Sequence, residues 1–275
     1  MPEGPEIRLA ADRLHKVLAD QVIEDVEFTL PELEGAAKRV RGKKVERVTC
    51  HGKAMLTQFD HGETLYSHNQ LYGVWRIAKR GNFPRTNRQL RVALHTDDHS
   101  ALLFSATDVE LWPTEHLAEH PFLKKLGPDV LDESLTAAMI ASRLRDKTFA
   151  RRSLASLYLD QGFVAGIGNY LRSEILFQAK VPPKARPADL TKTEIQRLGR
   201  ATLTISQRSY RTKGVTVTQA TAKKLKQQGG GFESYRFAAF GRKGQACLNC
   251  GTKIVRDEIG ARRLYWCPTC QGPKS

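Results

Sequence analysis

The spacing of apolar residues changes along the chain, and each change predicts a different kind of structure. Between Pro5 and Asp20, apolar residues recur every three or four positions, as they do on one face of a helix. Residues 22–30 and several short runs between 44 and 112 read instead as strands, separated by turn residues such as Gly, Asp and Asn. Many short strands at this interval predict an antiparallel sandwich or barrel that follows an N-terminal helix.

Helical spacing returns from about residue 134 to residue 213. Thr191 and Glu194 form a capping box that predicts the start of one helix. Gly166 and Gly168 are typical of tight turns, and Asn169 is expected to be the N-cap of the helix that follows them. Amides at such a helix N-terminus would bind phosphate; the alternative is that the glycines only permit close helix packing.

The segment 214–235 shows no periodicity and is rich in Thr, Lys, Gln and Gly, which predicts a flexible loop or linker. We therefore expect an α+β protein in four parts. These are a sandwich domain at 1–125, a helical domain at 126–213, the loop at 214–235 and a cysteine-rich module at 236–275.

The cysteine-rich module carries the strongest single motif. Cys247 and Cys250 are separated by two residues, as are Cys267 and Cys270, and sixteen residues lie between the pairs. This spacing is typical of a structural zinc ion held by four thiolates. Two redox-active pairs are the alternative, but the crowding and the strand-like residues between the pairs favour zinc and a β-hairpin.

Charge narrows the choice of partner. The 275 residues include 44 basic and 29 acidic side chains, which leaves a net charge of +15. Such an excess favours a polyanionic partner, of which nucleic acid is the commonest. A membrane surface is the alternative, but no apolar run reaches transmembrane length and the first residues do not resemble a signal peptide. We therefore expect a cytoplasmic protein.

Pro2 and Glu3 are the first candidates for chemistry. Removal of Met1 would leave Pro2 with a free secondary amine, which forms a cationic iminium with an aldehyde. An α-amino group has a pKa near ~7.8, against ~10.4 for lysine, so more of it is unprotonated at neutral pH. Glu3, directly beside it, would shuttle protons. The alternative is that these residues only start a helix.

Two further stretches carry candidate residues. Lys53 follows Gly52 at a break between strands, where a solvated surface charge is the ordinary interpretation. Gln70, Leu71 and Tyr72 follow a polar run at the edge of a strand. They would form a wedge that fills the gap left when a base is flipped out of a duplex, whereas core packing of the two apolar residues is the alternative.

Taken in order, these motifs resemble the formamidopyrimidine-DNA glycosylase and endonuclease VIII family of base-excision repair enzymes, and most closely its bacterial endonuclease VIII branch. The resemblance covers nearly the whole chain, from Met1-Pro2-Glu3-Gly4-Pro5-Glu6 to the cysteines. It implies a monomeric, bifunctional DNA glycosylase and AP lyase that acts on double-stranded DNA with damaged bases or abasic sites and is associated with the nucleoid through DNA. It also implies a helix–two-turn–helix domain followed by the zinc-bound hairpin.

The resemblance assigns roles to individual residues. Pro2 displaces the damaged base and forms the iminium, and Glu3 assists with acid–base chemistry at the sugar. Lys53 and Arg262 hold phosphates and assist β- and δ-elimination; Arg262 is the fifth residue before the third cysteine, and its neighbour Arg263 is the alternative. The residues implied in DNA binding are Gln70, Leu71, Tyr72, Lys125 and Asn169.

The lesion is the least constrained part of this interpretation. Gly4 and the three adjacent wedge residues favour the branch that removes oxidised pyrimidines, and a glycosylase for oxidised purines is the alternative. A non-catalytic sensor of distorted DNA is a further alternative, against which Pro2, Glu3 and Lys53 argue. In this family a loop in the region 214–235 can also close over the flipped base.

Overall fold

The structure is a computed structural model that describes residues 2–272, and its chain divides into two compact units. Of the described residues, Pro2 and residues 6–125 form the first unit, whereas residues 3–5 and 126–272 form the second. The N-terminal segment therefore passes from one unit to the other and back within its first six residues.

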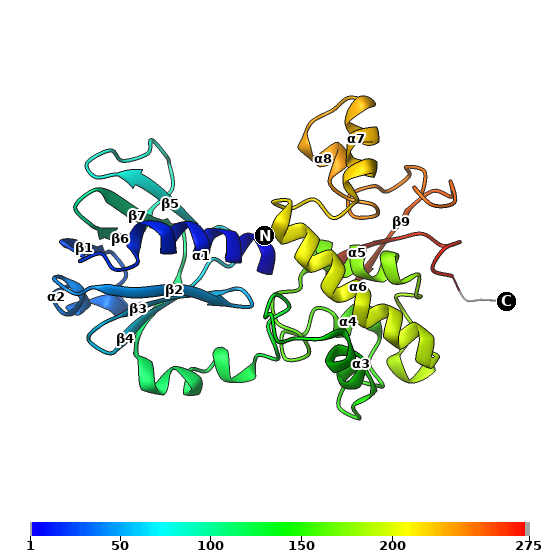
Figure 1. The fold of residues 1–275 in the computed structure, drawn as a ribbon, viewed down its shortest axis with the longest axis horizontal. Helices are drawn as coiled ribbons and strands as arrows, with labels where there is room; N and C mark the ends of the chain where they lie inside the picture. The colour runs from blue at the N-terminus through cyan, green and yellow to red at the C-terminus, as the bar shows by residue number, and fades with distance from the viewer. Residues whose placement is uncertain (1, 273–275) are drawn as a thin grey trace. The chain divides into compact units, whose positions relative to one another are not determined.

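The first unit is an antiparallel β-sandwich, as predicted. Among the described residues, one four-stranded sheet has the order β1-β6-β7-β5 and the other the order β2-β3-β4-β8 (Figure 1). The strands are β1 Asp25–Phe28, β2 Val45–His51, β3 Ala54–Phe59, β4 Glu63–His68, β5 Val74–Lys79, β6 Leu90–His95, β7 His99–Phe104 and β8 Asp108–Pro113. Short helical segments connect or follow them at α2 Ala36–Val40, η1 Pro31–Leu33, η2 Thr114–Glu119 and η3 Leu123–Lys125.

Helix α1 (Gly4–Leu18) closes the core of this unit. Ile7, Ala11, Leu14 and Leu18 are buried at intervals of three or four residues and join one cluster with side chains of both sheets. This is the apolar face that the sequence spacing predicts.

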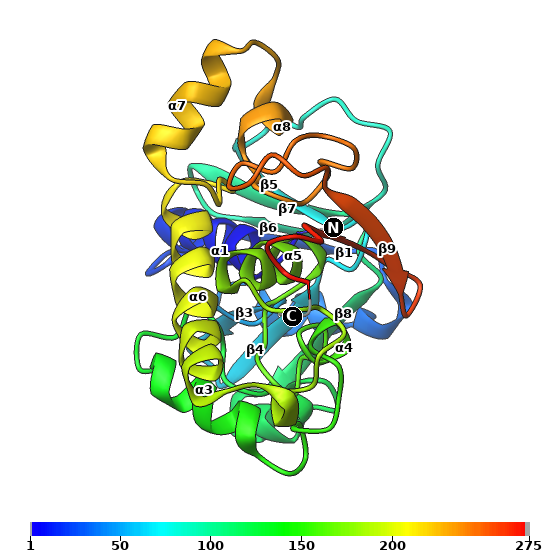
Figure 2. The same ribbon diagram turned by 90° about the vertical axis from the view of Figure 1, so that its right-hand side faces the viewer.

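The second unit is built around α5 (Asn169–Ala179). Nine of its eleven residues are buried, so the helix is surrounded rather than amphipathic. It packs against α6 (Lys192–Arg211) and against β10 (Arg262–Trp266), which pairs with β9 (Val255–Ile259) in an antiparallel hairpin (Figure 2). Helices α3 (Ala137–Arg145) and α4 (Leu154–Leu157) complete the same core.

Two predictions about the second unit can be compared with its helices. The capping box is present, because the Thr191 hydroxyl accepts the Glu194 amide while the Glu194 carboxylate accepts the Thr191 amide. The flexible loop or linker expected at 214–235 is not borne out for residues that form α7 (Gln219–Gln227) and α8 (Phe232–Tyr235). In α7 only Leu225 is buried, so the apolar pattern is too sparse to reveal the helix, although Thr218 caps it.

A buried carboxylate ties the segment before the zinc hairpin to α5. Glu174, 1% exposed, accepts the Thr216 hydroxyl at 2.6 Å. It also accepts the backbone amides of Ala238, Ala239 and Phe240 at 2.8–2.9 Å. The residues 238–240 lie in no helix or strand, so this side chain supplies the partners that a regular element would otherwise provide.

Candidate active site and zinc centre

Glu3 is buried at the N-terminus of α5. One carboxylate oxygen accepts the amide of Tyr170 at 2.8 Å, and the other accepts the amides of Gly168 at 2.8 Å and Leu171 at 3.1 Å. These amides belong to the first turn of a helix, which has no carbonyl partners of its own to offer them. The Glu3 carboxylate therefore caps α5 from a position more than 160 residues earlier in the chain.

This cap corrects two predictions about Asn169. The N-cap is Gly168, and Asn169 is the first helical residue. Glycine is required at 168 because a Cβ added there would lie 2.5 Å from Cδ of Glu3. Three of the amides that were expected to bind phosphate, those of Gly168, Tyr170 and Leu171, are instead bound by Glu3.

The backbone next to Glu3 is also packed closely against the segment before α5. The Gly4 amide donates to the Gly166 carbonyl at 2.7 Å, and a Cβ added to Gly4 would approach the Gly166 Cα to 3.1 Å. A larger residue at position 4 would therefore require this backbone to shift by a few tenths of an ångström. Pro2, half-buried, is one peptide bond from the fixed Glu3. Met1, whose removal the sequence predicts, lies outside the described residues.

A buried guanidinium connects Asn169 to the zinc hairpin. Arg172 is completely buried, and it donates to the Asn169 side-chain oxygen at 2.9 Å and to the Arg263 carbonyl at 3.0 Å. Burial lowers the pKa of Arg172 to about 10, the Glu3 carboxylate raises it, and the nearby positive charge of Arg262 lowers it further. Asn169 thus contacts Arg172 directly, and Glu3 and Arg262 act on it through their charges.

The hairpin geometry separates the two candidate arginines. Arg262 pairs with Ile259 and Arg263 with Glu258, and both side chains are exposed. Successive side chains of a strand point to opposite faces. Arg262 therefore shares the strand face of Leu264, which packs into the same core as α5, whereas Arg263 contributes its backbone carbonyl to Arg172.

In the first unit, Lys53 lies close to the predicted wedge. It occupies the turn between β2 and β3 and is half-buried. Ala54, the next residue, pairs with His68, which places Lys53 near the end of β4. Burial lowers the pKa of His68, the Asp108 carboxylate raises it, and the Lys53 ammonium lowers it. His68 in turn accepts the Gln70 amide at Nδ1, at 3.0 Å.

The predicted wedge is an exposed turn between β4 and β5. Leu71 is 51% exposed and Tyr72 67% exposed, which excludes the alternative that they pack in the core. Gln70 has a φ of 48°, in the left-handed region, and its side-chain oxygen accepts the Thr107 hydroxyl at 2.9 Å. Arg88 donates to the Tyr72 carbonyl, so the backbone of the turn is supported on both sides.

Lys125 is exposed at the end of η3 in the first unit. The hydrogen bonds there run through its backbone, whose amide donates to the Phe122 carbonyl at 3.2 Å. An exposed ammonium at this position is available for a phosphate contact.

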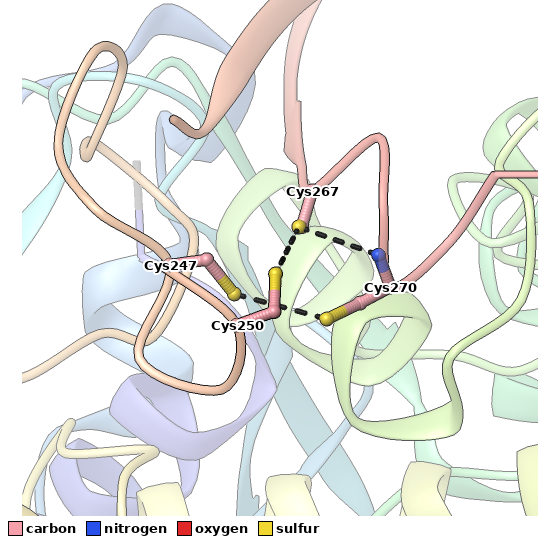
Figure 3. Close-up of side chains that lie close together, drawn as sticks. All are labelled: Cys247, Cys250, Cys267 and Cys270. Carbon is pink, nitrogen blue, oxygen red and sulfur yellow. Dashed lines mark hydrogen bonds between the residues drawn. The ribbon is translucent and has the colours of Figure 1, made fainter. Parts of the chain in front are cut away.

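The four cysteines of the C-terminal module converge on one point (Figure 3). Sγ of Cys247 lies 3.9 Å from that of Cys270, Sγ of Cys250 lies 3.4 Å from that of Cys267, and the four sulfurs lie within 4.8 Å of one another. Tetrahedral zinc with Zn–S bonds of about 2.3 Å needs sulfurs about 3.8 Å apart. The arrangement fits one zinc ion and is too open for a disulfide.

Sequence reasoning missed Arg172 and Glu174 as functional supports. Both lie in α5 among Leu171, Ile175 and Leu176, which are fully buried. A charged residue in a helix that is apolar on every side must find partners when it is buried. That signal was present in the sequence, but apart from Asn169 the partners lie 17 to 91 positions away and were not identifiable from it.

Family models match three parts of the chain. The formamidopyrimidine-DNA glycosylase N-terminal domain matches residues 1–108, and the formamidopyrimidine-DNA glycosylase H2TH domain matches residues 126–221. The zinc finger found in FPG and IleRS matches residues 244–272. The sulfur geometry and this match together confirm the predicted structural zinc site.

Similar proteins match over the full length. Proteins named endonuclease 8 from Pectobacterium atrosepticum and from Escherichia coli are each 44% identical over 271 residues, which is 98% of this chain and 100% of theirs. Formamidopyrimidine DNA glycosylase of Lactococcus lactis, solved with DNA containing an AP site, is 24% identical. It has a TM-score of 0.81 and covers 98% of this chain and 100% of its own.

A second structure of the Lactococcus lactis enzyme, in complex with DNA containing an oxidised pyrimidine, gives a TM-score of 0.83 at 24% identity. It covers 99% of this chain and 100% of its own. At this identity, the likeness establishes the α+β fold. Among residues 2–272, no helix combines the length and the apolar character needed to cross a membrane.

Proposed function

This chain belongs to the endonuclease 8 family of DNA glycosylases and AP lyases of base-excision repair, and on that premise we propose that Pro2 is its nucleophile. The observation that carries the proposal is the fixed position of Glu3. Its carboxylate is bound to three amides of α5, so the residue next to it cannot move far. A nucleophile held in this way meets the sugar in a defined orientation.

In the proposed reaction, the lone pair of the Pro2 nitrogen forms a bond to C1′ of the damaged nucleotide. The bond from C1′ to the base breaks, and the base leaves with that electron pair and a proton. Opening of the sugar ring gives an iminium, which stays cationic because a secondary amine has no remaining N–H to lose. Two eliminations then expel the 3′ and the 5′ phosphates, and water releases Pro2.

The other site residues have separate roles in the proposed reaction. Glu3 exchanges protons at the sugar from an orientation that α5 sets, and Lys53 assists the eliminations from the first unit. Arg262 and Asn169 hold the phosphates next to the lesion, supported by Arg172. Lys125 adds a further phosphate contact, and the net charge of +15 supplies salt-dependent affinity for any duplex.

Borohydride trapping tests the nucleophile. Reduction during turnover of abasic duplex should join DNA to residue 2, as peptide mass spectrometry of the conjugate would reveal. A tag added at the N-terminus should abolish the conjugate because the Pro2 nitrogen becomes an amide, while the same tag at the C-terminus should not. Full lyase activity with a blocked N-terminus would refute the mechanism, because it would show that the Pro2 nitrogen is not the nucleophile.

We further propose that the substrates are oxidised pyrimidines in double-stranded DNA. The supporting observation is the exposed wedge, where Leu71 and Tyr72 project beside Gln70. Three adjacent residues can fill the gap in the stack and contact the partner base together, which relaxes the requirement for one partner. A non-planar pyrimidine also stacks poorly on its neighbours, so flipping it out of the duplex costs less than the few kcal/mol that an undamaged base requires.

A comparison of lesions tests this preference. Thymine glycol and dihydrouracil duplexes should be cut much faster than 8-oxoguanine opposite cytosine. Leu71→Ala and Tyr72→Ala should slow base excision far more than cleavage at a preformed abasic site. A preference for 8-oxoguanine opposite cytosine would instead assign the protein to the oxidised-purine alternative.

A further inference from the structure

The second unit contains a cavity that the proposed reaction does not use. It has a volume of about 590 Å³ and lies between α5, α6, α7 and the segment 238–249 that leads into the zinc site. On α5 it is lined by Glu174, Phe177 and Gln178, which lie more than one turn beyond the end that Glu3 caps. A cavity of this size is in the range of sites for small organic ligands.

The cavity wall carries an excess of positive charge. Arg208, Arg242 and Lys224 line it, and the carboxylate on the same wall is that of Glu174. Both oxygens of Glu174 are already occupied, since they accept one hydroxyl and three backbone amides. The carboxylate therefore offsets part of the charge without being the hydrogen-bond partner of these guanidinium groups.

The two arginines are partly desolvated. Burial lowers the pKa of Arg208 and of Arg242, and the Glu174 carboxylate raises both. Arg208 donates to the Thr216 carbonyl at 2.7 Å, and Arg242 donates to the Ala246 carbonyl at 3.2 Å. Within the described residues, Nε of Arg242 is buried and has no hydrogen-bond partner. A buried N–H of a cation without an acceptor is costly, and the Arg242 side chain that carries it lines the cavity.

We propose that this cavity binds the phosphate of a small organic phosphate monoester of mononucleotide size. The guanidinium groups of Arg208 and Arg242 match a phosphate in geometry and charge, and Lys224 adds a third cation. The apolar side chains of Leu225 and Leu248 and the amide of Gln228 provide surface for the organic part. Such a ligand bridges α6, α7 and the segment before Cys247.

Calorimetric titration of the zinc-loaded, full-length protein tests the proposal, with adenosine monophosphate, inorganic phosphate and adenosine as separate ligands. The monophosphate should bind at one site per chain and at least roughly tenfold more tightly than either other ligand. Equal affinity for inorganic phosphate would overturn the organic part of the proposal, and equal affinity for adenosine would overturn the phosphate part.

Charge variants locate the site. Arg242→Gln should lower the affinity at least roughly tenfold, while Lys243→Gln, the loss of an exposed charge one residue away, should not. Lys224→Glu should also lower the affinity, and it is a second test of the site because Lys224 is exposed and its replacement leaves the core unchanged. Zinc content measured in each variant verifies folding. Binding that survives both Arg242→Gln and Lys224→Glu, or that a short undamaged duplex displaces, would place the ligand elsewhere and overturn the proposal.

Discussion

Glu3 has two tasks that compete for the same atoms. Three amides of the first turn of α5 bind its oxygens, yet the proposed reaction asks it to exchange protons with the sugar. The capping of α5 explains why Glu3 is buried and belongs to the second unit, although most of α1, the helix that follows Glu3 in the chain, belongs to the first.

Glu3→Gln should therefore lower stability as well as activity. The side-chain NH2 of Gln would face an amide donor, and leaving buried donors unpaired costs about 1–3 kcal/mol. Chemical unfolding of the second unit, followed by the fluorescence of Trp266 in a variant that lacks Trp75 and Trp112, measures this change. Glu32→Gln, an exposed control, should leave the unfolding free energy unchanged. Full stability of Glu3→Gln would contradict the capping role.

Arg262 and Arg263 provide a test at neighbouring positions. Arg262→Ala should weaken binding to any duplex and lower the salt dependence by about one unit, since one phosphate contact is lost. Arg263→Ala should have the smaller effect, because the backbone carbonyl of this residue is the part that contacts Arg172. Binding measured across a salt series distinguishes the two. A larger loss for Arg263→Ala would mean that the assignment of the hairpin faces is wrong.

At the scale of elements, His68 connects the end of β4 to the wedge formed by Gln70, Leu71 and Tyr72. His68 holds the Gln70 amide at Nδ1, which is an acceptor only while the ring is neutral. Phe122 packs against the ring, and Lys53 and Asp108 are the charged groups that act on it. Because the pKa of His68 is lowered in the folded protein, its stabilising contribution is fully present above the unfolded value of about 6.5, and it is lost as the pH falls through the lower pKa of the folded state.

An NMR titration of His68 measures this directly. Its pKa should lie below the ordinary histidine value of about 6.5. Lys53→Met should raise the pKa of His68 by removing a positive charge, and Asp108→Asn should lower it. If neither substitution changes the pKa of His68, Lys53 does not act electrostatically on the residue that holds the wedge.

Zinc should be needed for the hairpin but not for the sandwich. Removal of the ion by a chelator should unfold the segment around Cys247–Cys270, displace Arg262 and weaken DNA binding, because folding of such modules is coupled to metal binding. The first unit has its own core and should stay folded. Cys250→Ser should lower the zinc content of the purified protein, whereas Cys50→Ser should retain one zinc per chain. Active protein without zinc would contradict this prediction.

Elements whose signal is local were predicted well. The sandwich strands follow from the alternation of apolar residues, α6 from the capping box, and the zinc site from cysteine spacing. The N-cap of α5 was assigned wrongly because its capping group is Glu3, which no sequence window around Asn169 contains. Helix α7 was missed because one buried residue, Leu225, gives no periodicity. Local rules fail where the partner is far away in sequence.

For the molecule as a whole, the residues proposed for the reaction are distributed over both units. Lys53 and the wedge belong to the first, and Asn169, Arg172 and Arg262 belong to the second, while Pro2 is assigned to the first and Glu3 to the second. Each group is held by contacts inside its own unit. Sequence order indicated the parts of this site but not the contacts that hold them, since Arg172 bonds to residues on both sides of it in the chain.

The Glu174 carboxylate has a consequence for how the protein opens in solution. Backbone amides outside helices and strands usually exchange their hydrogens with water quickly, because brief local openings expose them. The amides of residues 238–240 cannot open alone, since they are bonded to a side chain buried in α5. Deuterium uptake at these positions should be as slow as in α5 itself, and Glu174→Gln should accelerate it. An irregular stretch of chain would thereby exchange together with the most protected helix.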